Sequence, residues 1–471
     1  MKKLYPHQEE AVEQVRQAFM KGSKRVCLQA PTGMGKTVVA THVIKSALAK
    51  GKKVLFLVHL KELIEQTATT MMEAGLQYGY ISASYPFTKG KQLYLASTQT
   101  LSRRLGKIPF QPDFIVYDEF HHAPAKTSRI ILDHYRDCYL LGLTATPQRL
   151  DGKGLIDVAD TLVTTITTGQ LIERGFLSKY EYYGPMSGID FDNVHTMAGD
   201  YNPKEMEEEL DKTQIFGKVV EHYKKFVFGK PALCFCLNIK HSIKIANEFK
   251  MAGIPSAHLD GTTPRLERER INNEFKSGKI WVLVNVALVT EGYDVPACKA
   301  IFLTRPTQSL TIFLQSVGRG LRKSGDDVCY IFDHVENYKR HGMPDDEREW
   351  SLLGEEKSAK TTKKKSKDYI ACSNCGFTYL PKKYKICPKC SNQEMGTKET
   401  QHTNHELQKI TGYKKEEVRK NTFTKEQIKE MKRKCRTIDD YKNLARTLNY
   451  KEGWARMQMG LRDKWKKRFA Q

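Results

Sequence analysis

The sequence predicts an α/β protein in which two tandem parallel-sheet domains are followed by a small four-cysteine module and a basic helical C-terminal region. Two stretches of the 471-residue chain alternate short apolar runs with helix-like segments, which is typical of parallel sheets. Behind them, four cysteines form two Cys-x-x-Cys pairs, and the remaining sequence is rich in lysine and arginine. The length suffices for about three domains with cores of their own.

The first α/β domain is expected to span residues 1–175. Its short apolar runs predict five strands: Arg25–Gln29, Val54–Val58, Leu93–Ser97, Phe114–Tyr117 and Tyr139–Leu143. The second domain is expected to span residues 176–340, with four strands: Ala232–Leu237, Ile280–Val286, Ala300–Leu303 and Val328–Phe332. The stretch from 150 to 230 has a weaker pattern, so we expect it to contain the crossover between the domains.

The region behind the two domains divides by composition. Residues 341–368 are charged and small and end in a run of lysines, which is typical of a linker. Residues 369–393 hold the four cysteines and are expected to form a zinc-ribbon-like module. Residues 394–471 are basic with helical periodicity, which predicts a helical C-terminal region.

The positive charge is concentrated at the C-terminal end. The chain carries 77 Lys and Arg against 54 Asp and Glu, a net charge of +23. Residues 351–471 contain 31 basic and 14 acidic residues, whereas the first 350 contain 46 and 40. Such a basic tail favours a polyanionic partner, because each neutralised phosphate releases counterions. A solvated tail and a membrane-surface patch are the alternatives.

The sequence also indicates a cellular compartment. No apolar run reaches the roughly 18 residues that cross a membrane, and the N-terminal lysines are not followed by an apolar signal segment. The chain has eleven cysteines, an odd number, and most of those outside the two pairs lie in or beside apolar strand-like runs. This distribution argues against a disulfide framework. We therefore expect a cytoplasmic protein with no membrane partner.

Residues 30–37, APTGMGKT, form a candidate phosphate-binding loop. They follow an apolar strand and precede a helix-like segment, which is the context that such a loop requires. Gly33 and Gly35 allow backbone N–H groups to turn toward phosphates at a helix N-terminus. Lys36 is expected to reach the β- and γ-phosphates, and Thr37 to hold Mg²⁺. The loop begins with Ala30, where the usual pattern has glycine.

Residues 118–121, DEFH, directly follow the apolar run FIVY. A carboxylate at the end of a strand, downstream of a phosphate-binding loop, is placed to anchor Mg²⁺, which predicts that role for Asp118. Glu119 is then the candidate group that orients or deprotonates the attacking water. Two acids after a strand are common by themselves, so the prediction depends on their pairing with the loop.

Residues 315–322, QSVGRGLR, supply candidate cations for the transition state of phosphoryl transfer. Arg319 and Arg322 are three residues apart, about one helical turn, so we expect them to face the same way. They belong to the second α/β domain, whereas the phosphate-binding loop belongs to the first. The sequence therefore predicts ATP between the two domains.

Taken together, these motifs resemble those of the superfamily 2 DExH helicases over roughly the first 335 residues. The resemblance implies two RecA-like domains and an ATP-dependent helicase. It identifies YPHQ at 5–8 as the adenine-reading segment, with Gln8 as the reader, and implies that Thr32 belongs to the ATP site. TATP at 144–147 corresponds to the coupling motif. The remaining implied roles are nucleotide contact for Gly292 and Asp294 of VTEGYDVP, catalysis for Gln315, and coupling for His121, Thr144 and Thr146.

The resemblance also implies a nucleic-acid path. The segments HLKELIEQ, STQTL and DGTTPRLERER are similar to motifs that contact the sugar-phosphate backbone without reading bases. The residues implied as contacts are His59, Ser97, Gln99, Thr262 and Thr290. Within the superfamily the chain most resembles RadD-type bacterial and phage DNA helicases. This likeness implies DNA, single-stranded, branched or duplex, as the partner, with RNA as the second candidate.

The four-cysteine module predicts a structural zinc site. Cys372 and Cys375 form one pair and Cys387 and Cys390 the other, with 11 residues between the pairs. Two such pairs suit tetrahedral Zn²⁺, and an iron–sulfur cluster is the alternative. The module also contains aromatic residues beside three lysines that we expect to contact nucleic acid, Lys382, Lys383 and Lys385. The same rings alternatively cover the module's small core.

The expected activity is that of an ATP-dependent DNA helicase or translocase that uses ATP, magnesium and zinc. The resemblance implies a role in phage or bacterial DNA replication, recombination or repair, with protein partners from those processes. One alternative is a nucleic-acid-stimulated ATPase that remodels or anneals DNA or RNA without processive unwinding. Another is a zinc-dependent binding protein with a vestigial ATPase, which the complete set of ATP-site residues argues against.

Overall fold

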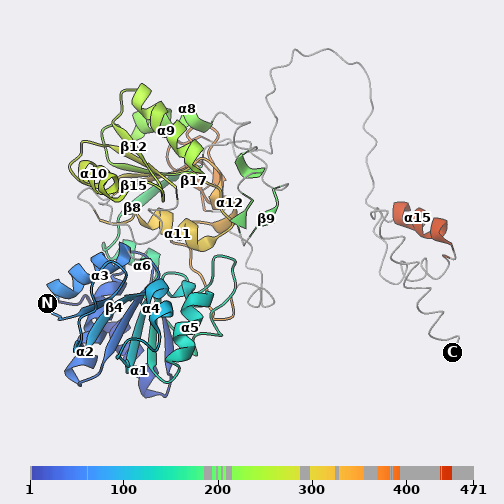
Figure 1. Cartoon of the computed structure of the whole chain (residues 1–471). Coiled ribbons are helices and arrows are strands. Elements are labelled where there is room, and N and C mark those ends of the chain that lie inside the picture. The colour runs from blue at the N-terminus through green and yellow to red at the C-terminus, as the bar shows by residue number, and fades with distance from the viewer. Residues whose placement is uncertain are drawn as a thin grey trace, which may run out of the picture. The chain divides into compact units, whose positions relative to one another are not determined.

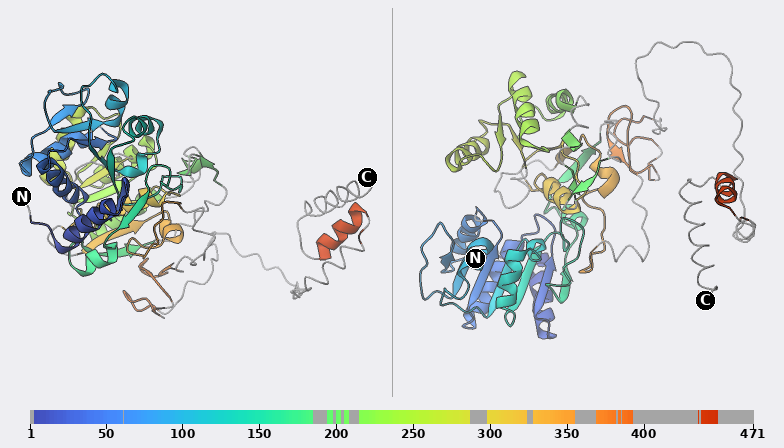
Figure 2. Two further views of the ribbon diagram at one scale, coloured as in Figure 1. Left: turned by 90° about the horizontal axis from the view of Figure 1, so that it is seen from below. Right: turned by 45° about the vertical axis from the view of Figure 1, so that its right-hand side comes forward.

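The computed structural model describes residues 3–60, 62–184, 194–197, 200–202, 205–207, 215–286, 298–323, 328–354, 369–381, 383–384, 386–392, 435 and 437–447. The chain divides into two compact units, residues 1–399 and 400–471. The first unit contains two α/β lobes and the four-cysteine module, as Figures 1 and 2 show. In the described part of the second unit, Thr437 caps the helix α15 (Ile438–Thr447) by accepting a hydrogen bond from the Asp440 backbone N–H (3.2 Å).

The first lobe is built on a seven-stranded parallel sheet in the order β3-β4-β2-β5-β6-β1-β7. Its strands are β1 (Arg25–Gln29), β2 (Val54–Val58), β3 (Gly79–Ile81), β4 (Leu93–Ser97), β5 (Phe114–Asp118), β6 (Tyr139–Thr144) and β7 (Thr161–Thr164). Its helices are α1 (Pro6–Met20), α2 (Lys36–Ala49), α3 (Glu62–Glu73), α4 (Thr98–Arg104), α5 (Lys126–His134), α6 (Thr168–Glu173) and the 3-10 turn η1 (Phe120–His122). The central strands are almost wholly buried, because helices cover both faces of the sheet.

The second lobe has a six-stranded parallel sheet in the order β12-β13-β11-β14-β15-β8. Its strands are β8 (Lys179–Tyr183), β11 (Ala232–Phe235), β12 (Ser256–Leu259), β13 (Val282–Asn285), β14 (Ala300–Leu303) and β15 (Val328–Asp333). Its helices are α8 (Ile215–Phe226), α9 (Ile239–Met251), α10 (Arg265–Lys276), α11 (Leu310–Gly318) and α12 (Asn337–His341). A small antiparallel hairpin joins β9 (Thr196–Met197) and β10 (Asp200–Tyr201). The two parallel-sheet domains predicted from the sequence are thus confirmed.

The segment that follows α12 connects the two lobes. The carbonyl oxygen of Leu352 accepts hydrogen bonds from the backbone N–H groups of Leu155 (2.8 Å) and Ile156 (3.0 Å) in the first lobe. Here the backbone at Gly154 packs directly against the backbone at 352–354. A Cβ on Gly154 would lie 2.0 Å from the Leu352 carbonyl oxygen and 2.6 Å from the Gly354 backbone nitrogen. This close approach requires glycine at position 154. Residues 343–354 therefore form an ordered strap that runs from the second lobe to the first.

The four-cysteine module packs against the second lobe. Its two short strands, β16 (Ile370–Ala371) and β17 (Thr378–Tyr379), form an antiparallel pair. The backbone N–H of Gly184, just after β8, donates to the carbonyl oxygen of Gly376 (3.0 Å), and the rings of Tyr183 and Phe377 lie 5.7 Å apart. Because β8 is an edge strand of the second sheet, the module covers the end of an otherwise open sheet edge.

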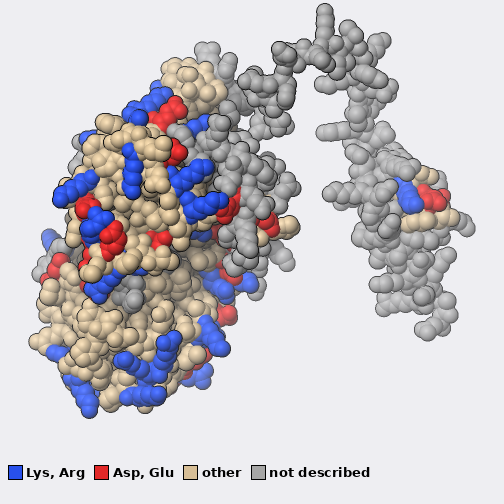
Figure 3. Space-filling view, turned by 45° about the horizontal axis from the view of Figure 1, so that its top comes forward, with Lys and Arg blue, Asp and Glu red and all other residues tan. Residues whose placement is uncertain are grey.

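The surface of the first unit mixes charges of both signs. On the face shown in Figure 3, basic side chains are spread over both lobes with acidic side chains among them. Among the described helices, none is long and apolar enough to cross a membrane.

Candidate active site

The loop between β1 and α2 has the backbone geometry of a phosphate-binding loop. Gly33 and Gly35 have φ angles of +88° and +93°, in the left-handed region that favours glycine. A Cβ on Gly35 would lie 2.4 Å from the side-chain nitrogen of Gln8, and one on Gly33 would lie 2.6 Å from Leu177. Both glycines are thus required by conformation and by close packing, and α2 begins directly behind them at Lys36.

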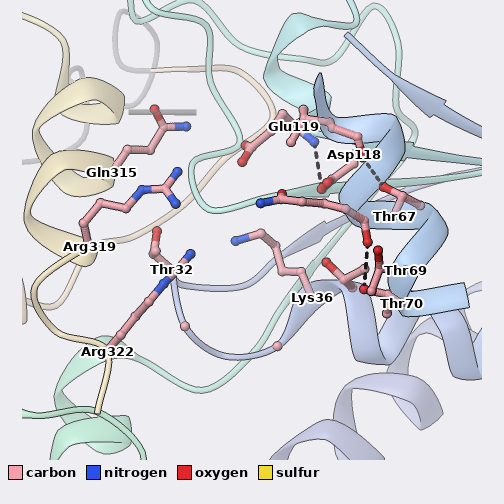
Figure 4. A pocket seen from close by; sticks show the side chains of 15 residues that line it. Thr32, Lys36, Thr67, Thr69, Thr70, Asp118, Glu119, Gln315, Arg319 and Arg322 are labelled. Atoms are coloured by element: carbon pink, nitrogen blue, oxygen red, sulfur yellow. Dashed lines mark hydrogen bonds between the residues drawn. The ribbon is translucent and has the colours of Figure 1, made fainter. Parts of the chain in front are cut away.

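A cavity of about 580 Å³ opens between the two lobes at this loop. Figure 4 shows Lys36 near its centre, the two acids above it, and the arginines on the opposite wall. From the first lobe the lining includes the loop and the acids, and from the second it includes α11 and the residues behind it. The predicted residues that line it are Thr32, Gly33, Gly35, Lys36, Thr37, Asp118, Glu119, Gln315, Arg319 and Arg322.

Lys36 lies deep in this cavity. Its ammonium group donates a hydrogen bond to the carbonyl oxygen of Ala30 (3.2 Å). Burial lowers the pKa of Lys36, because it disfavours the charged form, and the nearby carboxylates of Glu119 and Asp118 oppose that shift. Among the described residues, this half-buried ammonium donates to a carbonyl oxygen and so remains placed to bind an incoming anion such as phosphate.

Asp118 and Glu119 stand together at the end of β5. Burial, and then the charge of Glu119, raise the pKa of Asp118 to about 7, although Lys36 opposes the shift. Glu119 has φ +51°, a strained conformation for a residue other than glycine. One carboxylate oxygen of Glu119 lies 3.4 Å from the His121 imidazole Nδ1 but makes no hydrogen bond among the described residues. Two crowded, half-buried acids form a site at which a divalent cation with oxygen ligands would relieve the repulsion between the carboxylates.

The second lobe supplies the cationic wall. The sequence predicts that Arg319 and Arg322 face the same way from one helical turn; the helical part of this prediction is wrong, because α11 ends at Gly318 and Arg322 pairs with Leu177 in an isolated β-bridge. Both arginines nevertheless line the cavity. A Cβ on Gly318 would lie 2.7 Å from Thr32, so the end of α11 rests directly on the phosphate-binding loop.

Gln315 is the other residue of this wall that the sequence predicted. Its side chain is only 4% exposed, and neither its amide oxygen nor its amide nitrogen has a hydrogen-bond partner among the described residues. A buried carboxamide without partners is costly. Its position on the cavity wall therefore favours a polar ligand in the cavity.

A chain of buried hydrogen bonds joins the acids to the second lobe. The His121 imidazole Nδ1 lies 3.2 Å from the hydroxyl oxygen of Thr144, which donates to the Thr146 carbonyl oxygen (2.8 Å). The hydroxyl of Thr146 lies 2.8 Å from that of Thr311, in the first turn of α11. His121, Thr144 and Thr146, which the resemblance implied for coupling, are thus brought together, and Thr311 was not predicted.

Helix α3 adds a wall that sequence reasoning missed. Gln66, Thr67, Thr69 and Thr70 all line the cavity. The hydroxyl groups of Thr67 and Thr70 donate to carbonyl oxygens one turn earlier, at Leu63 (2.8 Å) and Gln66 (3.1 Å). The run QTATT, with polar residues on the helix that follows β2, was the available signal, but the family resemblance implies nucleic-acid contact for the overlapping segment HLKELIEQ.

Gln8 is a further predicted nucleotide contact. Gln8 is outside the cavity lining; its amide nitrogen donates to the Met34 carbonyl oxygen (3.0 Å), and its amide oxygen accepts from the Tyr5 backbone N–H (3.0 Å). It therefore supports the loop from behind in this structure. Gly292 and Asp294 lie outside the described residues.

The predicted nucleic-acid contacts differ in how far their side chains are exposed. Gln99 and Thr262 are exposed, whereas Ser97 is 3% exposed and its hydroxyl caps α4 by accepting from the Thr100 backbone N–H (3.3 Å). The ring of His59 stacks on that of His122 (4.0 Å). Lys383 is exposed and lies over the ring of Tyr384 (5.4 Å). Thr290, Lys382 and Lys385 lie outside the described residues.

The four module cysteines bring their sulfur atoms within 4.8 Å of one another. The Cys372–Cys390 and Cys375–Cys387 sulfur distances are 3.6 Å and 3.7 Å, too long for disulfides. Sulfur atoms around a tetrahedral zinc ion lie about 3.8 Å apart. The residues after the second cysteine of each pair, Gly376 and Ser391, both have positive φ, +72° and +59°, as two similar tight turns require. The donor set therefore fits a four-coordinate metal.

Comparison with known proteins identifies the family. Residues 1–149 match the type III restriction enzyme, res subunit family, and residues 211–324 match the helicase conserved C-terminal domain. A 51.5 kDa protein of a Lactococcus phage is 35% identical over 365 residues, which cover 78% of this chain and 77% of the phage protein. The chain belongs to the superfamily 2 helicases. The two matched domains carry the two walls of the cavity described above.

Further relatives of this superfamily 2 helicase are longer. IRC3 of Saccharomyces cerevisiae, whose name describes an ATP-dependent helicase, is 29% identical, over 70% of this chain and 51% of its own length. The structure of the ATP-dependent Type ISP restriction-modification enzyme LlaBIII bound to DNA shares the fold, with a TM-score of 0.52 and 21% identity. It covers 71% of this chain, which spans 28% of that enzyme. The helicase is thus an ATP-hydrolysing enzyme of a nucleic-acid-binding family.

Proposed function

We propose that this helicase is a DNA-dependent motor that hydrolyses ATP between its two lobes and moves along or unwinds DNA. The observation that carries the proposal is the shared cavity: Lys36 and the acid pair form one wall, and Arg319 and Arg322 form the other. Hydrolysis that needs both walls ties each catalytic cycle to the relative position of the lobes.

Each side chain in the cavity has a proposed role in hydrolysis. Lys36 binds the β- and γ-phosphates, and Glu119 orients the attacking water and accepts its proton. Thr37 and Asp118 would hold Mg²⁺, which neutralises phosphate charge when bound. Arg319, Arg322 and Gln315 stabilise the charge that develops on the transferred phosphoryl group. Gly292 and Asp294 remain proposed nucleotide contacts on the basis of the family resemblance.

The motor step is proposed to follow from the same arrangement. Bound ATP draws the arginine wall toward the phosphates, and product release lets the lobes separate. His121, Thr144 and Thr146 are proposed to pass this change to the nucleic-acid face. There, Gln99 and Thr262 are exposed and suited to phosphate contact, with His59, Ser97 and Thr290 as further proposed contacts.

DNA is the proposed nucleic acid, because the structural relative LlaBIII is described as bound to DNA and the chain's resemblance is to RadD-type DExH helicases. The +23 net charge supports binding to a polyanion. The four cysteines are proposed to hold a structural zinc ion, and Lys382, Lys383 and Lys385 to contact DNA. The proposed boundaries are 1–175, 176–340, 341–368, 369–393 and 394–471, with a role in phage or bacterial replication, recombination or repair.

The test is ATP turnover by the purified full-length chain with single-stranded DNA, duplex DNA and RNA. DNA is expected to stimulate hydrolysis more than RNA, and Lys36→Ala and Glu119→Gln to abolish the stimulated activity. A parallel strand-displacement assay on a tailed duplex separates unwinding from ATPase activity without unwinding. Hydrolysis that no nucleic acid stimulates, or equal rates in both variants and the wild type, would reject the motor.

A further inference from the structure

The hairpin β9–β10 contacts the loop that leads into α11. One carboxylate oxygen of Asp200 accepts hydrogen bonds from the Arg305 guanidinium (3.0 Å) and the Thr307 hydroxyl (2.9 Å). The other oxygen accepts from the Gln308 backbone N–H (2.7 Å). Asp200 and Arg305 are largely buried, with side chains 20% and 22% exposed. One carboxylate thus holds three groups within four consecutive residues of the loop.

Helix α12 holds the same loop from a second side. The side chain of Asn337 accepts from the Thr307 backbone N–H (3.0 Å) and donates to the Arg305 carbonyl oxygen (3.2 Å). The ring of His341 lies 2.8 Å from the Thr307 carbonyl oxygen and stacks on Phe313 of α11 (5.0 Å). The loop is therefore fixed between α12 and the hairpin.

The hairpin is itself tied to α12. The Arg340 guanidinium donates to the Tyr201 hydroxyl (3.2 Å) and lies 5.6 Å from the centre of that ring. Within the hairpin segment, Glu205 accepts hydrogen bonds from the His195 backbone N–H (2.8 Å) and the Asn202 side chain (2.9 Å). Asp200 is thus presented to the loop by a segment with its own internal hydrogen bonds.

This loop sets the start of the helix that carries the cationic wall. The Ser309 backbone N–H donates to the Thr307 hydroxyl (3.0 Å), and α11 begins at the next residue. Gln315 lies five residues beyond the first residue of α11, and Arg319 follows the last residue of the helix. A shift of the loop would therefore move both side chains relative to Lys36, and small displacements of catalytic groups lower rates strongly.

We propose that Asp200 is a positioning residue for ATP hydrolysis: the hairpin β9–β10 fixes the start of α11 and thereby places Gln315 and Arg319 against the phosphates. The inference rests on the proposed catalytic role of these two residues. Asp200 itself is not among the residues that line the cavity.

The experiment compares steady-state ATP hydrolysis by Asp200→Asn, Asp200→Ala and the wild type with saturating DNA. Asp200→Asn keeps an acceptor for the Gln308 backbone N–H but loses the charge that pairs with Arg305. We therefore expect its kcat to fall about 10-fold with an unchanged KM for ATP. The kcat of Asp200→Ala, which loses both, should fall further. The matched control is Asp151→Asn, because Asp151 also pairs with an arginine (3.2 Å to Arg149) and is 21% exposed. This control is expected to keep the wild-type kcat.

Two results would overturn the inference. In the first, kcat stays at the wild-type value in both Asp200 variants. In the second, the unfolding temperature of the variants falls while their kcat does not. Arg319→Lys, measured in parallel, separates this failure from that of the proposed function. If Arg319→Lys loses activity and the Asp200 variants do not, the hairpin has no role in catalysis. If Arg319→Lys retains full activity, the catalytic role of the cationic wall fails.

Discussion

The hydroxyl oxygens of Thr146 and Thr311 lie 2.8 Å apart and join the two lobes beside the ATP cavity. Both side chains are fully buried, at 0% exposure. Thr146 lies two residues beyond Thr144, whose hydroxyl contacts His121 beside Glu119, and Thr311 lies in the helix that leads to Arg319. This hydrogen bond therefore connects the first lobe's acids to the second lobe's cations.

Removal of either hydroxyl should weaken the response of the ATPase to nucleic acid. We expect Thr146→Val and Thr311→Val each to lower DNA-stimulated kcat about 3- to 10-fold, because a buried hydrogen bond contributes about 1 kcal/mol. The double variant should be no worse than either single variant, as residues that act through one contact are not additive. Additive losses would show that the pair does not act as a unit.

A matched control is available for the single and double variants of Thr146 and Thr311. The hydroxyl of Thr161 lies 2.7 Å from that of Ser23, at the far end of the first sheet from the cavity. Thr161→Val removes a hydrogen bond of the same kind and is expected to leave the stimulation by DNA unchanged. Thr311→Ser, which retains a hydroxyl, should restore it.

Gln66 should prove to be an ATP-site residue. It lines the cavity with Lys36 and the acids, although its segment resembles a nucleic-acid motif. We expect Gln66→Leu to lower kcat at least about 10-fold while DNA affinity is unchanged. The exposed Gln92, outside the cavity, provides the control Gln92→Leu. A loss of DNA affinity with normal kcat would assign Gln66 to the nucleic-acid path instead.

Asp118 should make the metal-free protein less stable as the pH rises. Its folded pKa of about 7 lies above the ordinary value of 3.8, so between these pH values the native state binds more protons than the unfolded state. The free energy of unfolding therefore falls from about pH 4 to about pH 7. Without Mg²⁺ and nucleotide, Asp118→Asn should raise the unfolding temperature by about 3 °C at pH 8 and not at pH 4. Equal temperatures at pH 8 would contradict this.

Loss of the metal site should weaken the second lobe as well as the module. Phe377 packs on Tyr183 of β8, which in turn stacks on Phe332 of β15 (5.3 Å). We expect the wild type to contain one zinc ion per chain and Cys387→Ser to lose it, with a fall in unfolding temperature of about 5 °C or more. Cys138→Ala, which changes a buried cysteine of the first lobe, should retain the metal. A metal-free wild type would contradict the zinc site.

The nine strands predicted from the sequence are all present, within a few residues at their ends. The four strands missed in the two parallel sheets are β3, β7, β12 and β8, which are the edge strands. Central strands are buried on both faces and therefore form continuous apolar runs such as VLFLV. An edge strand such as KYEYY is partly exposed and mixes polar with aromatic residues, so composition does not distinguish it from a loop.

The residues of the candidate site likewise include some that local motifs predicted and some that they did not. Local motifs predicted the phosphate-binding loop and the acids, because their function requires particular residues at fixed spacing. Thr311 belongs to no such motif, and the polar run QTATT that begins at Gln66 does not by itself indicate a cavity wall, since both positions depend on how α11 and α3 pack around the cavity. The spacing of the arginines did not predict their local structure, because α11 ends at Gly318, before both of them.

ATP hydrolysis by Arg319→Ala with saturating single-stranded DNA tests the two-wall site most directly. Arg319 lies in the second lobe yet lines the cavity with Lys36 and Glu119 of the first. A cation supplied in this way is worth about 1,000-fold or more in kcat, so we predict a loss of that size while the variant still binds ATP. Hydrolysis at the wild-type rate would show that the second lobe does not take part in the chemistry.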